Sequence, residues 1–529
     1  MSNPTPQKSP GLGSPQSSEE DFEIVFTPPL SPSVNTFPPK NPPMPSLSLN
    51  LRQKTSTIGL LSESYMNGST STSEPTNQYV ATITAKEMEG GGERAPVDIS
   101  VAMDVSGSMQ TNGKLELCKK TLLVLISELR PTDRFGLVAF SDSANEVFPL
   151  SFLTPSAKSD LINKVKKLST TGCTNISGGL GMCVNSLTSV PSFEVSSVRS
   201  VLLLTDGHAN RGIHEPSKLL NLVKGMIPTT ENISINTFGY GDDHNEELMK
   251  SISETPLNQG SYYYVETEDN VSSAFGDCLG GLLSVAAQNI KLTISVPSTC
   301  DGYEGVWNMK VLNPDAVKDP DNTNTYMVKM GDIFAEESKD FLINLNYRTS
   351  CASDLILTAT LEYLDIGTSS LVSSEVVEIK TAFVEGTEEV EGPDKYVVLQ
   401  GLRVRVYENL EKANASARSS GTVDIAKAMV TDTLAYIQST TSRLSLTPSE
   451  NASVAFYASD LNDCISSLRS YSEYSRHGSK MMMMKMQSHA RQRCNESNED
   501  TMNAYRGSSK KGYASKMKAK MSFFKLGTG

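Results

Sequence analysis

The stretch DVSGSM, residues 104 to 109, presents oxygen ligands at regular spacing. Asp104 ends a run of small apolar residues, and two hydroxyls, Ser106 and Ser108, follow at alternate positions. Two later segments add Thr174, just before a predicted helix, and Asp206, at the end of the apolar run LLLTD. Mg²⁺, or Mn²⁺ of similar size, prefers octahedral coordination by hard oxygen ligands of these types. We therefore predict one divalent-cation site formed by Asp104, Ser106, Ser108, Thr174 and Asp206.

These five residues are far apart in the chain, so a fold must bring them together. From about 96 to 285, apolar strand-like runs alternate with amphipathic helical segments. Such a pattern is typical of an α/β domain with a doubly wound, mostly parallel sheet covered on both faces. Asp104 and Asp206 each end a predicted strand, and ligand sites of such sheets lie at the carboxyl ends of the strands.

The regions around this domain have different periodicities. Residues 286–392 alternate apolar and polar positions, which predicts an antiparallel β-sandwich. A single strand within 76–95 is expected to join that sandwich, so that the α/β domain is inserted in it. Residues 393–472 return to helical periodicity with an apolar stripe, which predicts a helical C-terminal region.

Both ends of the chain have low-complexity composition. Residues 1–75 are rich in Pro and Ser, and 473–529 are basic and contain the methionine run 481–484, so we predict disorder in both. From residue 476 onward, twelve Lys or Arg stand against three acids, in a chain of net charge -13. This asymmetry is typical of an electrostatic tether, such as a weak anchor to anionic membrane for which the acidic body competes, and the simpler alternative is a solvated tail with no target.

Composition excludes several classes of protein. Eight cysteines occur without any C-x2-C pair, which excludes a sequence-evident zinc module and gives no disulfide framework. The net charge argues against binding of nucleic acid over the whole surface. The first residues contain no apolar signal-peptide core, and no run is long enough to span a membrane, so a cytoplasmic location is expected.

The sequence resembles the von Willebrand factor type A family. DVSGSM matches the D-x-S-x-S signature of that family, and Thr174 and Asp206 stand where the family places the rest of its metal-ion-dependent adhesion site. The resemblance implies that Asp104, Ser106 and Ser108 contact the cation or its waters. It also implies that Thr174 joins when the site holds a ligand, and that Asp206 acts directly or through water.

The order of the regions is also similar to that in a particular group of proteins. Intracellular eukaryotic proteins with a Vwaint domain, and plant and protist RING or U-box proteins with a type A domain, share the order of type A domain, sandwich and helices. The expected function is that of an intracellular adaptor or scaffold, with no enzyme activity, that engages acidic residues of partner proteins through the cation. The alternative is the substrate-recognition component of a ubiquitin ligase whose catalytic module is on another chain.

Simpler interpretations of single residues remain open. Each serine alone would serve as a strand-end cap, and Asp206 alone as a turn former. His208 has no acid–base partner placed by sequence and is interpreted as a loop residue. Cys118 and Cys183 fall on apolar helix faces and are expected in the core.

Overall fold

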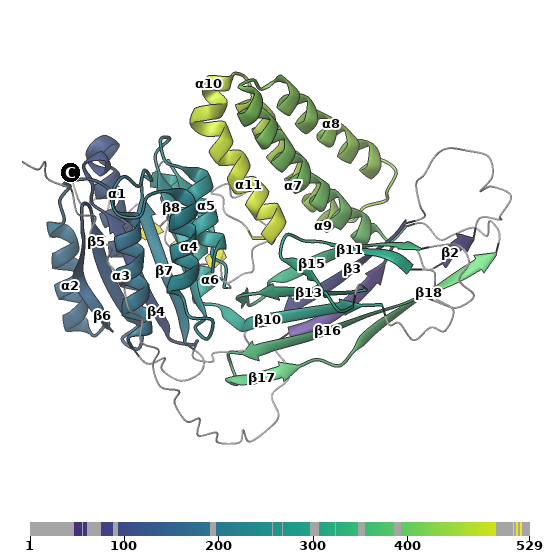
Figure 1. Cartoon of the computed structure of the whole chain (residues 1–529), viewed down its shortest axis with the longest axis horizontal. Coiled ribbons are helices and arrows are strands. Elements are labelled where there is room, and N and C mark those ends of the chain that lie inside the picture. The colour runs from purple at the N-terminus through teal and green to yellow at the C-terminus, as the bar shows by residue number, and fades with distance from the viewer. Residues whose placement is uncertain are drawn as a thin grey trace, which may run out of the picture. The chain divides into compact units, whose positions relative to one another are not determined.

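The α/β domain contains a six-stranded sheet in the order β6-β5-β4-β7-β8-β9 (Figure 1). The computed structural model describes residues 47–54, 57–60, 76–87, 94–190, 197–256, 258–266, 268–296, 306–322, 324–347, 355–385, 393–493, 511–512, 515–516 and 519–520. The parallel strands are β4 (Val97–Asp104), β5 (Arg134–Phe140), β7 (Val198–Thr205), β8 (Ile233–Tyr240) and β9 (Tyr262–Val265), and β6 (Ala144–Phe152) is antiparallel to β5. Every residue of β4, β5, β7 and β8 is buried, which explains why these strands are nearly continuous apolar runs.

Helices cover both faces of this sheet and confirm the predicted doubly wound fold. One face packs against α1 (Lys114–Glu128), α2 (Pro155–Lys167) and α6 (Glu268–Leu282). The other packs against α3 (Ile176–Thr188), α4 (Pro216–Met226) and α5 (Glu246–Glu254). The carboxyl ends of β4 and β7 are neighbours, with Met103 opposite Leu204, so the residues that follow these strands emerge side by side.

The predicted β-sandwich is present, and the α/β domain is inserted in it. Strand β3 (Thr76–Ala85), upstream of the α/β domain, pairs antiparallel with β15 (Ser338–Tyr347), far downstream of it. One sheet has the order β1-β3-β15-β11, with β11 at Val306–Leu312. The other runs β12 (Ala316–Lys318), β13 (Thr325–Met330), β10 (Val285–Ser295), β16 (Leu355–Asp365), β18 (Val377–Glu385) and β2 (Thr57–Leu60), with β14 (Ile333–Phe334) and β17 (Ser370–Ser373) beside this path.

The predicted disorder of residues 1–75 is wrong for the segments that form β1 and β2, the latter pairing with β18. Strand β1 (Leu47–Gln53) pairs antiparallel with β3, and Leu47 opposes Ala85. Leu47, Leu49 and Leu51 alternate along this strand and contribute to the apolar core of the sandwich. The Pro-rich composition before this strand and the Ser- and Thr-rich composition after it masked this short period-two pattern. Residues 1–46 and 61–75 lie outside the described residues, so the prediction is not tested there.

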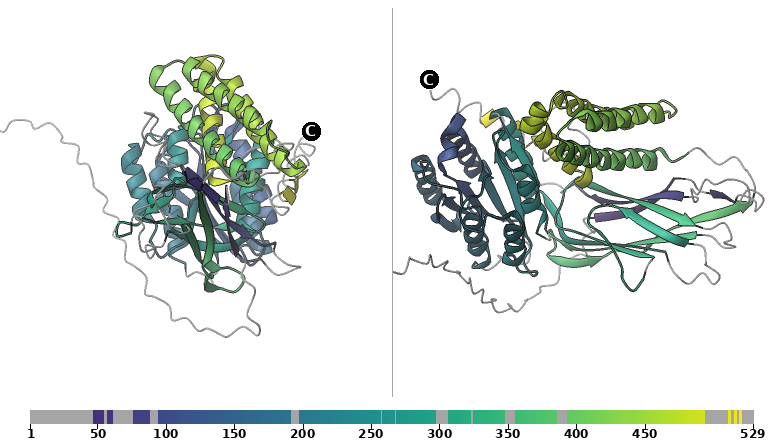
Figure 2. Two further views of the ribbon diagram at one scale, coloured as in Figure 1. Left: turned by 90° about the vertical axis from the view of Figure 1, so that its right-hand side faces the viewer. Right: turned by 45° about the horizontal axis from the view of Figure 1, so that its top comes forward.

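The predicted helical region comprises α7 (Lys395–Ser420), α8 (Asp424–Thr441) and α9 (Pro448–Ser467). A capping box at Thr447 and Glu450 begins α9, and Asp394 caps the first turn of α7. Helix α7 packs against β3 and β15, and against α8, α9 and α11 (Figure 2).

The predicted disorder from residue 473 onward is wrong for residues 473–493. After the short helix α10 (Tyr471–Glu473), one π turn leads into α11 (Ser479–Arg491). Four methionines of α11, Met482, Met483, Met484 and Met486, are buried in the apolar cluster shared by α7, α9 and one face of the α/β domain. Unbranched methionine side chains adapt to an irregular gap between elements, so a run that looked like low complexity is core.

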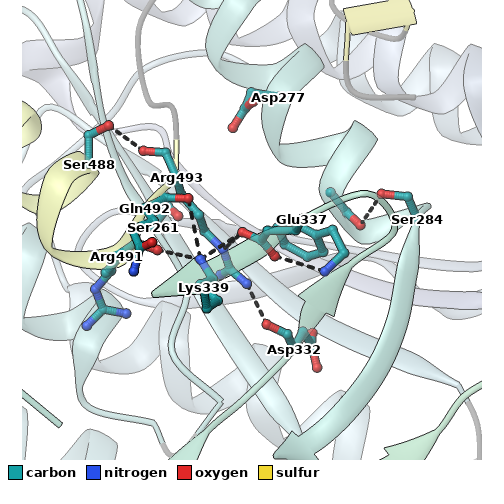
Figure 3. A network of polar contacts seen from close by, with 12 residues as sticks. Ser261, Asp277, Ser284, Asp332, Glu337, Lys339, Ser488, Arg491, Gln492 and Arg493 are labelled. Carbon is teal, nitrogen blue, oxygen red and sulfur yellow. Dashed lines mark hydrogen bonds and ion pairs between the residues drawn. The ribbon is translucent and has the colours of Figure 1, made fainter. Parts of the chain in front are cut away.

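The residues that follow α11 form a buried polar junction with the sandwich. Figure 3 shows Arg493 pointing toward Glu337 and Asp332. Arg493 Nε lies 3.1 Å from Glu337 Oε1, and its guanidinium stacks on the Phe334 ring at 4.1 Å. Lys339 Nζ lies 2.8 Å from the same Glu337 oxygen. Residues 479–493, which we call the C-terminal segment, therefore contact the α/β domain, the sandwich and the helical region.

Little of the basic tail is described. Lys516 Nζ lies 2.6 Å from Glu128 Oε2 at the end of α1, and Lys520 contacts Ser127 Oγ at 2.9 Å. These contacts join the tail to the acidic body, which is the expected internal competitor for the tail. The prediction of membrane contact remains untested. Among the described helices, none is long and apolar enough to cross a membrane.

Candidate metal site

Four of the five predicted ligands lie at one edge of the sheet and are joined by hydrogen bonds. Ser106 N donates to Asp104 Oδ1 at 2.8 Å, which fixes the turn directly after β4. The Ser106 and Ser108 hydroxyls are 3.0 Å apart, and Ser108 Oγ donates to Asp206 Oδ1 at 2.9 Å. The carboxyl ends of two neighbouring parallel strands thus place both carboxylates and both serine hydroxyls together, as predicted.

Thr174 is held beside this group through its backbone. Its N–H donates to Asn210 Oδ1 at 2.8 Å, and its carbonyl accepts from Asn210 N at 3.0 Å. The same loop meets the serine loop where Gly107 N donates to the Gly172 carbonyl at 3.1 Å. Gly172 has φ +65°, a conformation that L side chains rarely adopt. The loops that carry Thr174, Ser106 and Asp206 therefore converge at one place.

A buried lysine contacts the Asp206 carboxylate on its other oxygen. Lys114 is the first residue of α1, and its Nζ lies 3.0 Å from Asp206 Oδ2 and 3.0 Å from Asp243 Oδ1. The lysine side chain is only 8% exposed. Burial opposes the charged form, but the two carboxylates outweigh it, so the pKa of Lys114 is raised.

Asp104 lies in a different environment from Asp206. It is fully buried, and its oxygens accept hydrogen bonds from the neutral donors Ser106 N and Thr205 Oγ1, the latter at 2.6 Å. Burial raises the pKa of Asp104 to about 6, against which the hydrogen bonds from Thr205 and Ser106 act. Asp206 adds a smaller repulsion that raises the pKa further. A cation here would compensate a buried charge that has only neutral donors.

The donor set fits a hard divalent cation. It consists of carboxylate and hydroxyl oxygens, which suit Mg²⁺ or Mn²⁺ and do not suit zinc. Within the part of the chain that the structure describes, no group of three or more His, Cys, Asp or Glu side chains could hold a metal ion. A metal site at this edge would therefore depend on the serine hydroxyls together with the two carboxylates.

Sequence analysis missed three residues that shape the site: Thr205, Lys114 and Asn210. Thr205 directly precedes Asp206, and that adjacency was the available signal. Lys114 and Asn210 gave no signal, because their roles depend on how separate loops meet. The interpretation of His208 as a loop residue is confirmed, and Cys118 and Cys183 are buried in the core as expected.

Comparison with known proteins agrees with the fold of the α/β domain. Residues 98–277 match the family model of the von Willebrand factor type A domain. The chain contains a type A domain. A solved von Willebrand factor type A structure from Catenulispora acidiphila superposes with a TM-score of 0.57 at 17% identity, and covers 82% of this chain and 92% of that one. At this identity the likeness shows the fold.

Two curated relatives match part of the chain. The uncharacterized protein YfbK of Escherichia coli (strain K12) is 27% identical over 193 residues, or 36% of this chain and 32% of that protein. The E3 ubiquitin-protein ligase WAV3 of Arabidopsis thaliana is 25% identical over 359 residues, or 63% of this chain and 44% of that protein. The chain thus spans less than half the length of either relative.

Proposed function

We propose that the protein is a protein-binding adaptor or scaffold that engages an acidic residue of its partner through a divalent cation. Type A domains mediate protein interactions. The observation that carries the proposal is the hydrogen-bonded group of Asp104, Ser106, Ser108 and Asp206 at the carboxyl edge of the sheet. Mg²⁺ or Mn²⁺ bound there would offer a partner carboxylate a positive charge.

Each residue has a distinct role in this proposal. Asp104, Ser106 and Ser108 hold the cation or its waters, and Asp206 acts directly or through water. Thr174 lies on the neighbouring loop, where it can join when a ligand is present. The exposed side chain of Ser108 marks the open side of the site, and the buried carboxylate of Asp104 marks its floor.

The first test measures metal binding and partner binding separately. Calorimetric titration of the full chain with Mg²⁺ and with Mn²⁺ should show binding that Asp104→Ala abolishes while the circular dichroism spectrum is unchanged. Proximity labelling in cells should then recover partners with the wild type that Asp104→Ala loses. Partners that Asp104→Ala retains, and that also survive EDTA in a pull-down, would contradict the metal-bridged mechanism.

A second candidate function rests on the similarity to WAV3. We infer that the chain, if it acts in ubiquitination, recognises substrates for a ligase whose catalytic module is on another chain. The match over 359 residues to a protein named as an E3 ubiquitin-protein ligase supports this alternative. Affinity purification that recovers no ubiquitin-conjugating or ligase component would remove it. The expected cytoplasmic location remains a prediction.

A further inference from the structure

Lys114 shares the Asp206 carboxylate with the proposed cation site. Asp206 Oδ1 accepts from Ser108, and Asp206 Oδ2 contacts the Lys114 ammonium at 3.0 Å. The lysine belongs to neither the D-x-S-x-S stretch nor the two other loops that supply the predicted ligands. The Asp206 carboxylate nevertheless contacts both the Lys114 ammonium and the Ser108 hydroxyl.

The local backbone holds the lysine in this position. The end of β8 leads to Gly241, which has φ +81°. A Cβ added at Gly241 would lie 2.7 Å from Lys114 Cε, so the lysine stem runs directly over this glycine. The ammonium then reaches both Asp206 and Asp243. Long side chains lose rotamer freedom when they are fixed in this way, so the placement is specific.

We propose that Lys114 sets the affinity of the site for divalent cations by repelling them, and that Asp243 moderates this repulsion. The proposal rests on the proposed function, since it assumes that a cation binds at Asp104, Ser106, Ser108 and Asp206. Two positive charges that share one carboxylate repel each other, and a partly buried location screens them little. Asp243 contacts the same ammonium and partly neutralises it, but its side chain is 59% exposed, so its effect is smaller.

A purely structural role of Lys114 predicts a different change in the affinity for the cation. If Lys114 only holds Asp206 in the geometry that the cation needs, removal of either Lys114 or Asp243 lowers the affinity. Under the proposal, the two substitutions change the affinity in opposite directions. Lys114→Gln removes the repelling charge, and Asp243→Asn leaves the ammonium paired with Asp206 alone.

The experiment titrates Mg²⁺ and Mn²⁺ into the full chain by calorimetry at fixed pH and ionic strength. Lys114→Gln is expected to raise the affinity about tenfold, the order expected for removal of a nearby, weakly screened like charge. Asp243→Asn is expected to lower it about twofold to threefold, since this exposed charge is screened. Lys119→Gln is the matched control on α1, since Lys119 pairs with Glu116 instead, and it should leave the affinity unchanged.

The outcomes separate this inference from the proposed function. No metal binding by the wild type, or binding that Asp104→Ala retains, would reject the metal site itself. Metal binding that requires Asp104 but is unchanged or weakened by Lys114→Gln would reject only the role of Lys114. Circular dichroism and thermal melting in EDTA establish that each variant is folded. If Lys114→Gln does not fold, Lys114→Met takes its place, because it also removes the ammonium, and an unchanged or lowered affinity in that variant overturns the inference.

Discussion

At the proposed metal site, the group of Asp104, Ser106, Ser108 and Asp206 that we call the metal edge, the buried charge of Asp104 is stabilised differently from the buried charges of the C-terminal segment. In the C-terminal segment, Lys485 is 1% exposed and lies 2.7 Å from Asp460 and 2.9 Å from Asp463. Arg493 likewise forms a buried ion pair with Glu337. At the metal edge, the equally buried Asp104 accepts hydrogen bonds from neutral donors. The charges of the C-terminal segment are thus paired within the fold, and the charge of Asp104 can serve a ligand.

Truncation should have the largest effect, because the C-terminal segment is core in spite of its composition. A chain that ends at Gly478 loses four buried methionines of about 2 kcal/mol each, so a loss of roughly 8 kcal/mol is expected. Since typical domains have about 5–15 kcal/mol of stability, urea denaturation should show no cooperative transition.

The matched control is a chain that ends at residue 493, which keeps α11 and the Arg493 junction. It should unfold cooperatively and close to the full chain. If the chain ending at Gly478 unfolds like this control, the segment does not belong to the core.

Arg493, at the end of the C-terminal segment, and Arg476, just before its start, test how much buried and exposed ion pairs contribute to stability. Arg493→Ala should lower the free energy of unfolding by about 3 kcal/mol, because it removes a cationic partner of buried Glu337, which also pairs with Lys339. Arg476 is 66% exposed and pairs with Asp242, so Arg476→Ala should cost less than about 1 kcal/mol. Chemical denaturation of both variants measures the difference, and equal effects would contradict the contrast between buried and exposed pairs.

The sequence was sufficient for the α/β domain, the inserted sandwich and the convergence of Asp104 and Asp206 at one edge of the sheet, and the reason is physical. Strand and helix periodicities are local, and the position of Asp104 and Asp206 at the ends of apolar runs follows from where ligand sites of parallel sheets lie. It was insufficient for 47–53 and 473–493. In both, burial depends on distant elements, β3 for Leu47 and α7 for the methionines of α11, and composition alone indicated disorder.

The two carboxylates of the metal edge should differ in their effect on stability. In EDTA, Asp206→Asn should lower the free energy of unfolding by about 2 kcal/mol, because the buried Lys114 ammonium loses one of its two partners. Asp104→Asn should leave the stability unchanged or raise it, since it removes a buried charge whose hydrogen-bond donors are neutral. Parallel denaturation curves measure both, and a larger loss for Asp104→Asn would reverse this assignment.

The smallest expected effect concerns His244, which lies where the metal edge meets the C-terminal segment. Its Nε2 lies 2.6 Å from the Tyr262 hydroxyl, and burial lowers the pKa of His244 to about 4. The neighbouring charges are Lys480 on α11, which lowers this pKa further, and Glu246 and Asp243, which raise it. The folded state therefore keeps the imidazole neutral at mildly acidic pH.

The resulting pH dependence has a definite sign. Above the unfolded pKa of 6.5, His244 is neutral in both states, and its contribution to stability is full. As the pH falls from 6.5 toward 4, His244 binds a proton in the unfolded state but not in the folded state, so the free energy of unfolding decreases. The loss at pH 5.5 is about 1 kcal/mol. Carboxylates titrate in the same range and also change the stability, so a control variant is needed. The measurement therefore compares denaturation of His244→Gln with that of His214→Gln, which removes an exposed histidine, at pH 7.5 and 5.5. His214→Gln should keep the wild-type loss and His244→Gln should lose less by about 1 kcal/mol, whereas equal losses would show that His244 is not kept neutral by burial.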